Sequence, residues 1–212
     1  MHFINRLFGT RPTQKADADL APLHNPFNDT YLVVASALMF GLEARNARLQ
    51  FVEHCARVAD LAERVACELG VPADARDALG AAAQLHEIGI ISVPVELLEA
   101  PTRIAPEDRA LIREHAAVGA TIVRATHSER TARLIEHQYT DFARLQQVFS
   151  DDVDLLLAGI LRAADVFDAV THPRPYQERL RTTHRERILV QGSGSRFHPR
   201  AVEVLLHMEA HA

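Results

Sequence analysis

Apolar residues recur at helical spacing along most of the chain, and no segment shows the strict alternation that is typical of a half-buried β-strand. This pattern predicts an all-α fold. Gly70 and Pro72 close one long pattern, and the turn-forming stretch QGSGSRFHP precedes the last one. We expect helices at about residues 28–45, 47–69, 73–86, 94–99, 106–126, 128–139, 152–171, 176–190 and 199–210.

The first 27 residues differ from the rest because they are polar and interrupted by prolines. We expect residues 1–27 to form a flexible leader and residues 28–212 to form a single helical domain. Across the 212 residues, an apolar share of 48% and a charged share of 24% are those of a globular protein with one sizeable core.

Charge and composition argue against several classes of protein. The net charge is −5 and the basic residues do not form runs, so we expect no general surface for nucleic acid or anionic membrane. No apolar stretch is long enough to span a bilayer and no signal peptide is visible, which predicts a cytoplasmic protein. Lys15 is the only lysine, so no lysine is available for chemistry in the body of the chain.

Four ionisable side chains lie on the apolar faces of four different expected helices. They are His54, His86, His115 and Asp165. In the expected helix 106–126, for example, Leu111 and Val118 belong to the inward stripe that also carries His115. An inward histidine on its own is more often a hydrogen-bonded core residue than a metal ligand. A buried carboxylate such as Asp165, however, must be paired, protonated or bound to a metal.

One shared centre explains these four residues more economically than four separate accommodations. Imidazole nitrogen and carboxylate oxygen together suit divalent iron, manganese or zinc, with iron or manganese favoured, and no set of thiolates competes for that role. Cys55 and Cys67 lie about 18 Å apart on one expected helix and cannot form a disulfide with each other. We therefore expect a metal pocket at the centre of the helical domain, with Glu87 beside His86 at its edge.

In their order along the chain, these residues resemble the HD superfamily of metal-dependent phosphohydrolases, and in detail its HD-GYP branch. Four segments carry the resemblance over roughly residues 30 to 210. They are HCARVADLAERVACELGV, LHEIGIISVPVELLEAP, IREHAAVGATIV and ADVFDAVTHPRPY. The resemblance implies an HD-type helical domain with a central metal pocket, and a phosphodiester substrate such as cyclic di-GMP or a related nucleotide.

The resemblance also implies roles for individual residues. His86, Glu87 and Asp165 are expected to be catalytic, and Arg174 to contact the substrate phosphate. The metal ligands are expected among His54, His86, Glu87, His115, Glu136, His137 and Asp165, with His115, Glu136 and His137 holding a second ion. Gln50 stands where some members carry a glutamate for a third metal, so two divalent ions are expected at most. A solvated helix face for Glu136 and His137, and an exposed arginine at Arg174, are the structural alternatives.

The chain departs from the family pattern at three places. Glu87 replaces the aspartate of the His-Asp pair, and Ile90 stands where the family keeps a lysine near the substrate phosphate. The segment that carries the Gly-Tyr-Pro loop is reduced to EHQYTDF, which places Glu136 and His137 at two histidine positions. Glutamate still offers a bridging carboxylate one methylene further out, so the enzyme hypothesis survives the first change.

Three hypotheses for function follow. The first is a metal-dependent phosphodiesterase that acts on cyclic di-GMP or a related nucleotide. The second is a catalytically degenerate signalling module that binds a nucleotide or a protein partner, which the loss of the lysine and of the Gly-Tyr-Pro loop favours. The third is a phosphatase or nucleotidase acting on another phosphoester, because a metal centre alone does not choose the leaving group.

Overall fold

The computed structural model describes residues 50–98, 105–172 and 182–211, together with Ala37, Met39, Gly41 and Glu43. The four isolated residues are helical, in agreement with the expected helix 28–45, but most of that helix lies outside the described residues. The expected leader 1–27 and the start of the expected domain at residue 28 lie outside them too.

The described chain is helical throughout, and its only β-type pairing is an isolated bridge between Ser193 and Phe197. This confirms the predicted all-α fold. No helix in the described part is both long and apolar enough to cross a membrane. The elements are α3 (Phe51–Glu68), α4 (Ala73–Leu85), the 3-10 helix η1 (Ile88–Ser92), α5 (Val95–Leu98), α6 (Pro106–Arg113), α7 (His115–Thr126), α8 (Glu129–Glu136), α9 (Phe142–Val148), α10 (Asp152–Thr171), α11 (Thr182–Gly192) and α12 (Pro199–Ala210).

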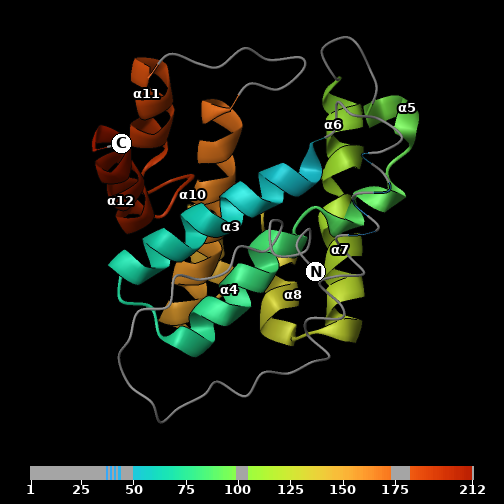
Figure 1. The fold of residues 1–212 in the computed structure, drawn as a ribbon, viewed down its shortest axis with the longest axis horizontal. Helices are drawn as coiled ribbons and strands as arrows, with labels where there is room; N and C mark the ends of the chain where they lie inside the picture. The colour runs from blue at the N-terminus through green and yellow to red at the C-terminus, as the bar shows by residue number, and fades with distance from the viewer. Residues whose placement is uncertain are drawn as a thin grey trace, which may run out of the picture.

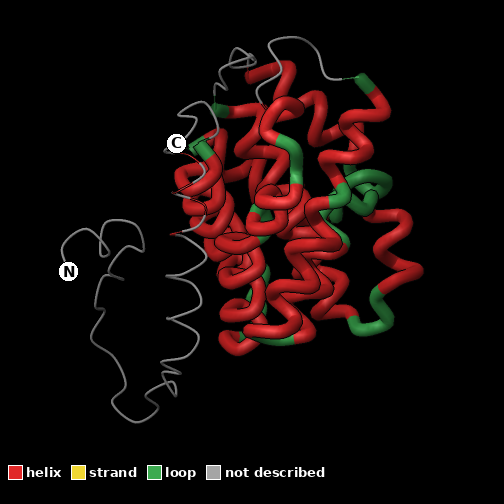
Figure 2. Tube along the Cα trace, turned by 90° about the vertical axis from the view of Figure 1, so that its right-hand side faces the viewer, coloured by secondary structure: helices red, strands yellow, loops and turns green. Residues whose placement is uncertain are grey.

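The long helices α3 and α10 form the centre of the fold. In Figure 1, α3 crosses α10, and it packs against both α10 and α4. On one side of this crossing, α7 lies along α8 and contacts η1; on the other side, α11 and α12 pack against α10. Figure 2 shows the same helices from the side, joined by short loops into one packed body. The apolar core between them includes Val58, Leu79, Leu134, Leu161 and Leu205, all at most 1% exposed.

Helix ends follow local chemistry at several points. Gly70 ends α3 with a φ of 69°, and the amide of Val71 donates to the carbonyl of Ala66 at 2.9 Å, as in a Schellman motif. The side chain of Asp151 accepts from the amide of Asp154 and caps α10. These signals are local in sequence, which is why the predicted ends of both helices lie close to the observed ones.

The expected helix 106–126 is wrong as a single element. The chain breaks at Glu114 into α6 and α7, and the amide of Glu114 bonds to Leu111 three residues back rather than four. Leu111 and Val118 are exposed instead of facing inward, at 45% and 36%, because the buried face of α7 is formed by residues such as Ala116, Gly119 and Val123. His115 is buried as expected. The short helix α9 was not predicted, since its apolar residues are too few to show a period.

Two glycines let η1 and α7 approach more closely than side chains would allow. A Cβ atom on Gly89 would overlap the carbonyl oxygen of His115, and a Cβ atom on Gly119 would lie 3.2 Å from the amide nitrogen of Gly89. The turn that follows His86 and Glu87 therefore lies directly against the first turn of α7, where His115 begins the helix.

We expect Gly89→Ala to lower the free energy of unfolding by about 2 to 3 kcal/mol, because the added methyl group has to push η1 and α7 apart. Urea unfolding followed by circular dichroism measures the loss. Gly80→Ala in α4 is the matched control, since a Cβ atom there meets nothing within 4 Å. It is expected to be neutral or to stabilise by up to about 1 kcal/mol. Equal stability of the two variants would contradict the close approach at Gly89.

Candidate metal centre

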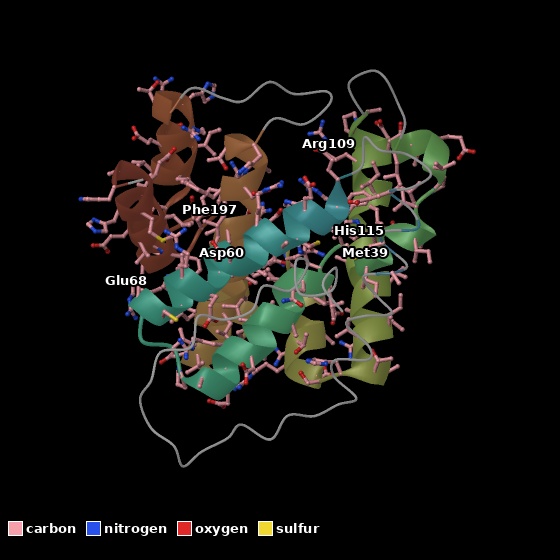
Figure 3. The ribbon with its side chains drawn as sticks, in the orientation of Figure 1. Met39, Asp60, Glu68, Arg109, His115 and Phe197 are labelled. Carbon is pink, nitrogen blue, oxygen red and sulfur yellow. The ribbon has the colours of Figure 1, made fainter. Side chains whose placement is uncertain are left out.

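The four ionisable residues singled out in the sequence converge from four helices. His54 lies in the first turn of α3, His86 caps the end of α4, His115 begins α7, and Asp165 lies within α10. Glu87 follows His86 in the turn before η1. In Figure 3 the label of His115 lies near the N-terminal end of α3, opposite the end marked by Glu68. All three histidines and Glu87 are at most 7% exposed.

The three histidines share one orientation. Nδ1 of His86 lies 2.7 Å from the carbonyl oxygen of Ala83, and Nδ1 of His115 lies 2.6 Å from that of Ile112. Nδ1 of His54 lies 2.7 Å from a carboxylate oxygen of Asp168. Because these oxygens only accept, each Nδ1 carries the proton, and in the neutral ring each Nε2 presents a lone pair to the centre. This is the arrangement that protein ligands to a metal ion commonly adopt.

His54, His86 and Asp165 form the tightest group. Their ligand atoms lie within 4.8 Å of one another, and within the described ranges they are the one such group of three. Nε2 of His54 lies 3.2 Å from Nε2 of His86 and 3.3 Å from Oδ1 of Asp165. Two nitrogen lone pairs and a carboxylate oxygen this close together are stabilised by a positive charge between them. The donor set therefore fits a divalent cation.

The pKa values of these groups point the same way. Burial alone lowers the pKa of His54, but hydrogen bonds to Asp165 and Asp168 outweigh burial and raise the pKa to about 9. Burial alone would raise the pKa of Asp165, but the hydrogen bond and charge of His54 hold it well below its usual range. Burial lowers the pKa of His86. The site thus favours a positive charge among these three residues; a proton on His54 meets this demand in part, and a divalent cation would meet it fully.

Glu87 lies between this group and His115. Its Oε1 is 3.8 Å from Nε2 of His86 and 3.9 Å from Nε2 of His54, whereas its Oε2 is 3.3 Å from Nε2 of His115. Oε1 of Glu87 therefore faces His54 and His86, and Oε2 faces His115. The extra methylene relative to aspartate does not turn the carboxylate away from the centre.

Asp168 was missed in the sequence, although it lies in the quoted segment ADVFDAV, one helical turn after Asp165. It is 1% exposed, and its Oδ2 accepts a hydrogen bond from Nδ1 of His54, on the side of the ring away from the centre. Nε and Nη2 of Arg57 donate to its two oxygens at 2.7 and 3.1 Å, and His172 approaches at 2.8 Å. Burial alone would raise the pKa of Asp168, but His54 and Arg57 lower it to about 2. Asp168 follows Asp165 by three residues, as Arg57 follows His54 by three. This matching spacing was the signal in the sequence that could have indicated the pair of Asp168 and Arg57.

The structure does not bring Glu136 and His137 to His115. Glu136 is exposed, and its Oε2 accepts from Nη2 of Arg124 at 2.8 Å. The ring of His137 packs edge-on against Phe149. Glu136 thus lies on a solvated helix face, which was the structural alternative to a ligand role. The side chain that approaches Nε2 of His115 from this segment is Tyr139, whose hydroxyl lies 3.4 Å away.

Gln138 supports the centre from the segment that follows α8. Gln138 is buried, and its Nε2 donates to the carbonyl of His86 at 2.9 Å, which ties the segment after α8 to the turn that carries Glu87. Neither Gln138 nor Tyr139 was predicted from the sequence, because their partners are far along the chain. Arg174, expected at the substrate phosphate, lies outside the described residues.

Comparison with known proteins adds independent findings. A family model described as HD domain matches residues 41–201. The chain is 27% identical to a cyclic di-GMP phosphodiesterase of Thermotoga maritima, over 74% of this chain and 44% of the relative. It is 28% identical to a cyclic di-GMP phosphodiesterase response regulator of Xanthomonas campestris (76% and 43%) and to 3'3'-cGAMP-specific phosphodiesterase 3 of Vibrio cholerae (82% and 39%). The chain spans less than half the length of each of these relatives.

Proposed function

Because the chain belongs to the HD domain family, whose model matches most of its length, we propose that it is a metal-dependent phosphohydrolase that cleaves a phosphodiester. The observation that carries the proposal is the common orientation of His54, His86 and His115. Each ring has its Nδ1 engaged and its Nε2 directed at a carboxylate of the centre. A core histidine needs only one partner and has no reason to share this arrangement with two others.

Two divalent ions are proposed, with iron or manganese favoured and zinc also suited to the ligands. His54, His86 and Asp165 would hold one ion, His115 would contribute to the other, and Glu87 would bridge them. Bound there, the ions supply charge neutralisation at a phosphate oxygen and increase the acidity of a water molecule, which phosphodiester hydrolysis requires. Asp168 keeps the ring of His54 in place, and Gln138 anchors the turn that carries Glu87.

The proposed substrate is cyclic di-GMP or a related nucleotide such as 3'3'-cGAMP. Support comes from the relatives, which are named for phosphodiesterase activity on these two molecules.

The proposal is tested on protein purified without chelator. Its metal content is measured by mass spectrometry, and hydrolysis of bis(4-nitrophenyl) phosphate, cyclic di-GMP and 3'3'-cGAMP is followed by absorbance and chromatography. We expect bound iron or manganese and turnover of at least one phosphodiester, lost on chelation and restored by the metal. Metal-loaded protein that cleaves none of the three would overturn the proposed activity.

A second candidate function is a signalling module that binds a nucleotide or a protein partner without turnover. The observation in its favour is that Ile90, which replaces the expected lysine, is 3% exposed and supplies no charge. Calorimetric binding of cyclic di-GMP to metal-loaded protein, with no product after prolonged incubation, is the result expected of this function.

Asp168→Asn is expected to weaken metal binding by about 10- to 100-fold, because it removes the negative charge behind His54 and loosens the ring. Titration of the metal-free protein with Mn²⁺, read by calorimetry, measures the change. The matched control is Asp154→Asn on the same helix, which removes a 2.7 Å ion pair with Arg130 remote from the centre. Weakening by the same factor in both variants would mean that Asp168 acts only through overall stability.

A further inference from the structure

We propose that Arg162 forms an anion subsite beside the candidate metal centre and binds a phosphate oxygen of the substrate. The inference rests on the proposed phosphodiester chemistry and names a residue for which neither the sequence pattern nor the relatives give a role. Its basis is a buried guanidinium with an unsatisfied donor, placed between Asp165 and the segment that reaches His115.

Arg162 is buried but poorly paired. It is 6% exposed, and its Nε is buried with no hydrogen-bond partner. The carboxylate of Asp141 lies 3.6 Å from its Nη2, which is too far for a hydrogen bond, and that side chain is more than half exposed. Arg57, by contrast, makes two hydrogen bonds to the buried carboxylate of Asp168. A guanidinium taken out of water without matched acceptors is costly, unless a ligand supplies the acceptors.

The position of Arg162 connects it to the centre. It lies one helical turn before Asp165 on α10, so the two side chains lie on neighbouring parts of the same face. On its other side, Asp141 follows closely after Tyr139, whose hydroxyl approaches Nε2 of His115. Arg162 therefore lies between Asp141, 3.6 Å from its Nη2, and Asp165, one turn further along α10.

Packing restricts where the guanidinium can move. It lies 5.9 Å from the ring centroid of Phe197, which is fully buried and labelled in Figure 3 beside α10. The amide of Phe142 at the start of α9 donates to the carbonyl of Arg196, the residue before Phe197. The guanidinium is thus held by its surroundings rather than by an acceptor, which is the state expected of a preorganised anion site.

A cation beside the metal ions would also favour the binding of an anionic substrate. Glu87, Asp165 and Asp168 are all acidic and repel a phosphodiester in the absence of positive charge. Ile90 supplies no charge, Arg57 is already bound to Asp168, and the guanidinium of Arg113 lies over the ring of Tyr139. The planar guanidinium of Arg162 has N–H donors in a geometry that matches two phosphate oxygens.

Three variants test the subsite: Arg162→Met, Arg162→Lys and, as the control, Asp141→Asn. Metal content and helicity are measured first. The KM and kcat for bis(4-nitrophenyl) phosphate and the calorimetric Kd for inorganic phosphate are then compared in metal-loaded protein. We expect Arg162→Met to raise the KM and the phosphate Kd by at least about tenfold with unchanged metal content, and Arg162→Lys to show a smaller rise. Asp141→Asn is expected to bind phosphate at least as tightly as the wild type, since it removes a competing carboxylate.

The outcomes separate the subsite from the proposed function. If Asp141→Asn reproduces the loss seen in Arg162→Met, the arginine is only half of a structural pair and the subsite is overturned. Wild-type phosphate affinity in Arg162→Met also overturns it, as does wild-type protein that binds no phosphate. If Arg162→Met does not fold, Arg162→Lys decides by the same comparison, and an unchanged KM and Kd count against the subsite. If the protein binds phosphate through Arg162 but shows no turnover, the subsite is supported and only the proposed activity is overturned.

Discussion

Replacement of His86 by alanine is expected to leave the protein without bound metal and without phosphodiesterase activity. His86 is fully buried, and its Nε2 faces both His54 and Glu87, so no neighbouring side chain is placed to substitute for it. Loss of a direct ligand should exceed the 10- to 100-fold effect typical of residues that only support ligands. Metal content after purification and Mn²⁺ titration measure the loss.

Two further variants make this result specific. His86→Gln fills most of the space of the imidazole, so loss of metal in this variant cannot be attributed to a cavity. His127→Ala removes a half-buried histidine at the far end of α7, about 18 Å along the helix from His115, and is expected to keep its metal. A full complement of metal in His86→Ala would show that the assignment of ligands is wrong.

Glu87→Gln is expected to lower metal occupancy and to reduce turnover by at least about tenfold, whereas Glu87→Asp is expected to retain or raise both. The amide keeps the size of the side chain but loses the charge that one carboxylate presents to both sides of the centre. A loss of about 1.5 to 3 kcal/mol per charge-assisted contact corresponds to this factor. Aspartate restores the residue of the family pattern.

The comparison needs a surface glutamate as its control. Glu136→Gln removes a carboxylate that is paired with Arg124 on the exposed face of α8, and it is expected to match the wild type in metal content and rate. If Glu87→Gln behaves like Glu136→Gln in both measurements, the bridging role of Glu87 is excluded. If Glu136→Gln alone loses metal, the second-ion ligands expected from the sequence are correct and the surface pair is not the functional state.

Most helices could be predicted because their signals are local. The patterns for α3, α4, α10 and α12 repeat over three or more turns and are bounded by glycine, proline or a capping aspartate. Their bounds needed no tertiary information except at the start of α3, which begins at Phe51 rather than at residue 47. The break at Glu114 could not be predicted from periodicity, since the stripe continues across it. The break lies where Gly89 approaches the first turn of α7, and this contact joins residues that are far apart in the sequence.

The site shows the same division. An inward Asp165 and inward histidines on separate helices indicated a shared centre, because a buried carboxylate requires a partner wherever the chain folds. The order of the motifs indicated which family to expect. Which groups meet was decided only by the packing of α3, α4, α7 and α10: it places Asp168 behind His54 and Tyr139 beside His115, and it leaves Glu136 on the surface. The sequence by itself therefore determined most of the helices and the need for a positive charge, since both depend on local pattern and burial. The tertiary structure alone decided the break at Glu114 and the ligand orientations, since these depend on contacts between distant segments.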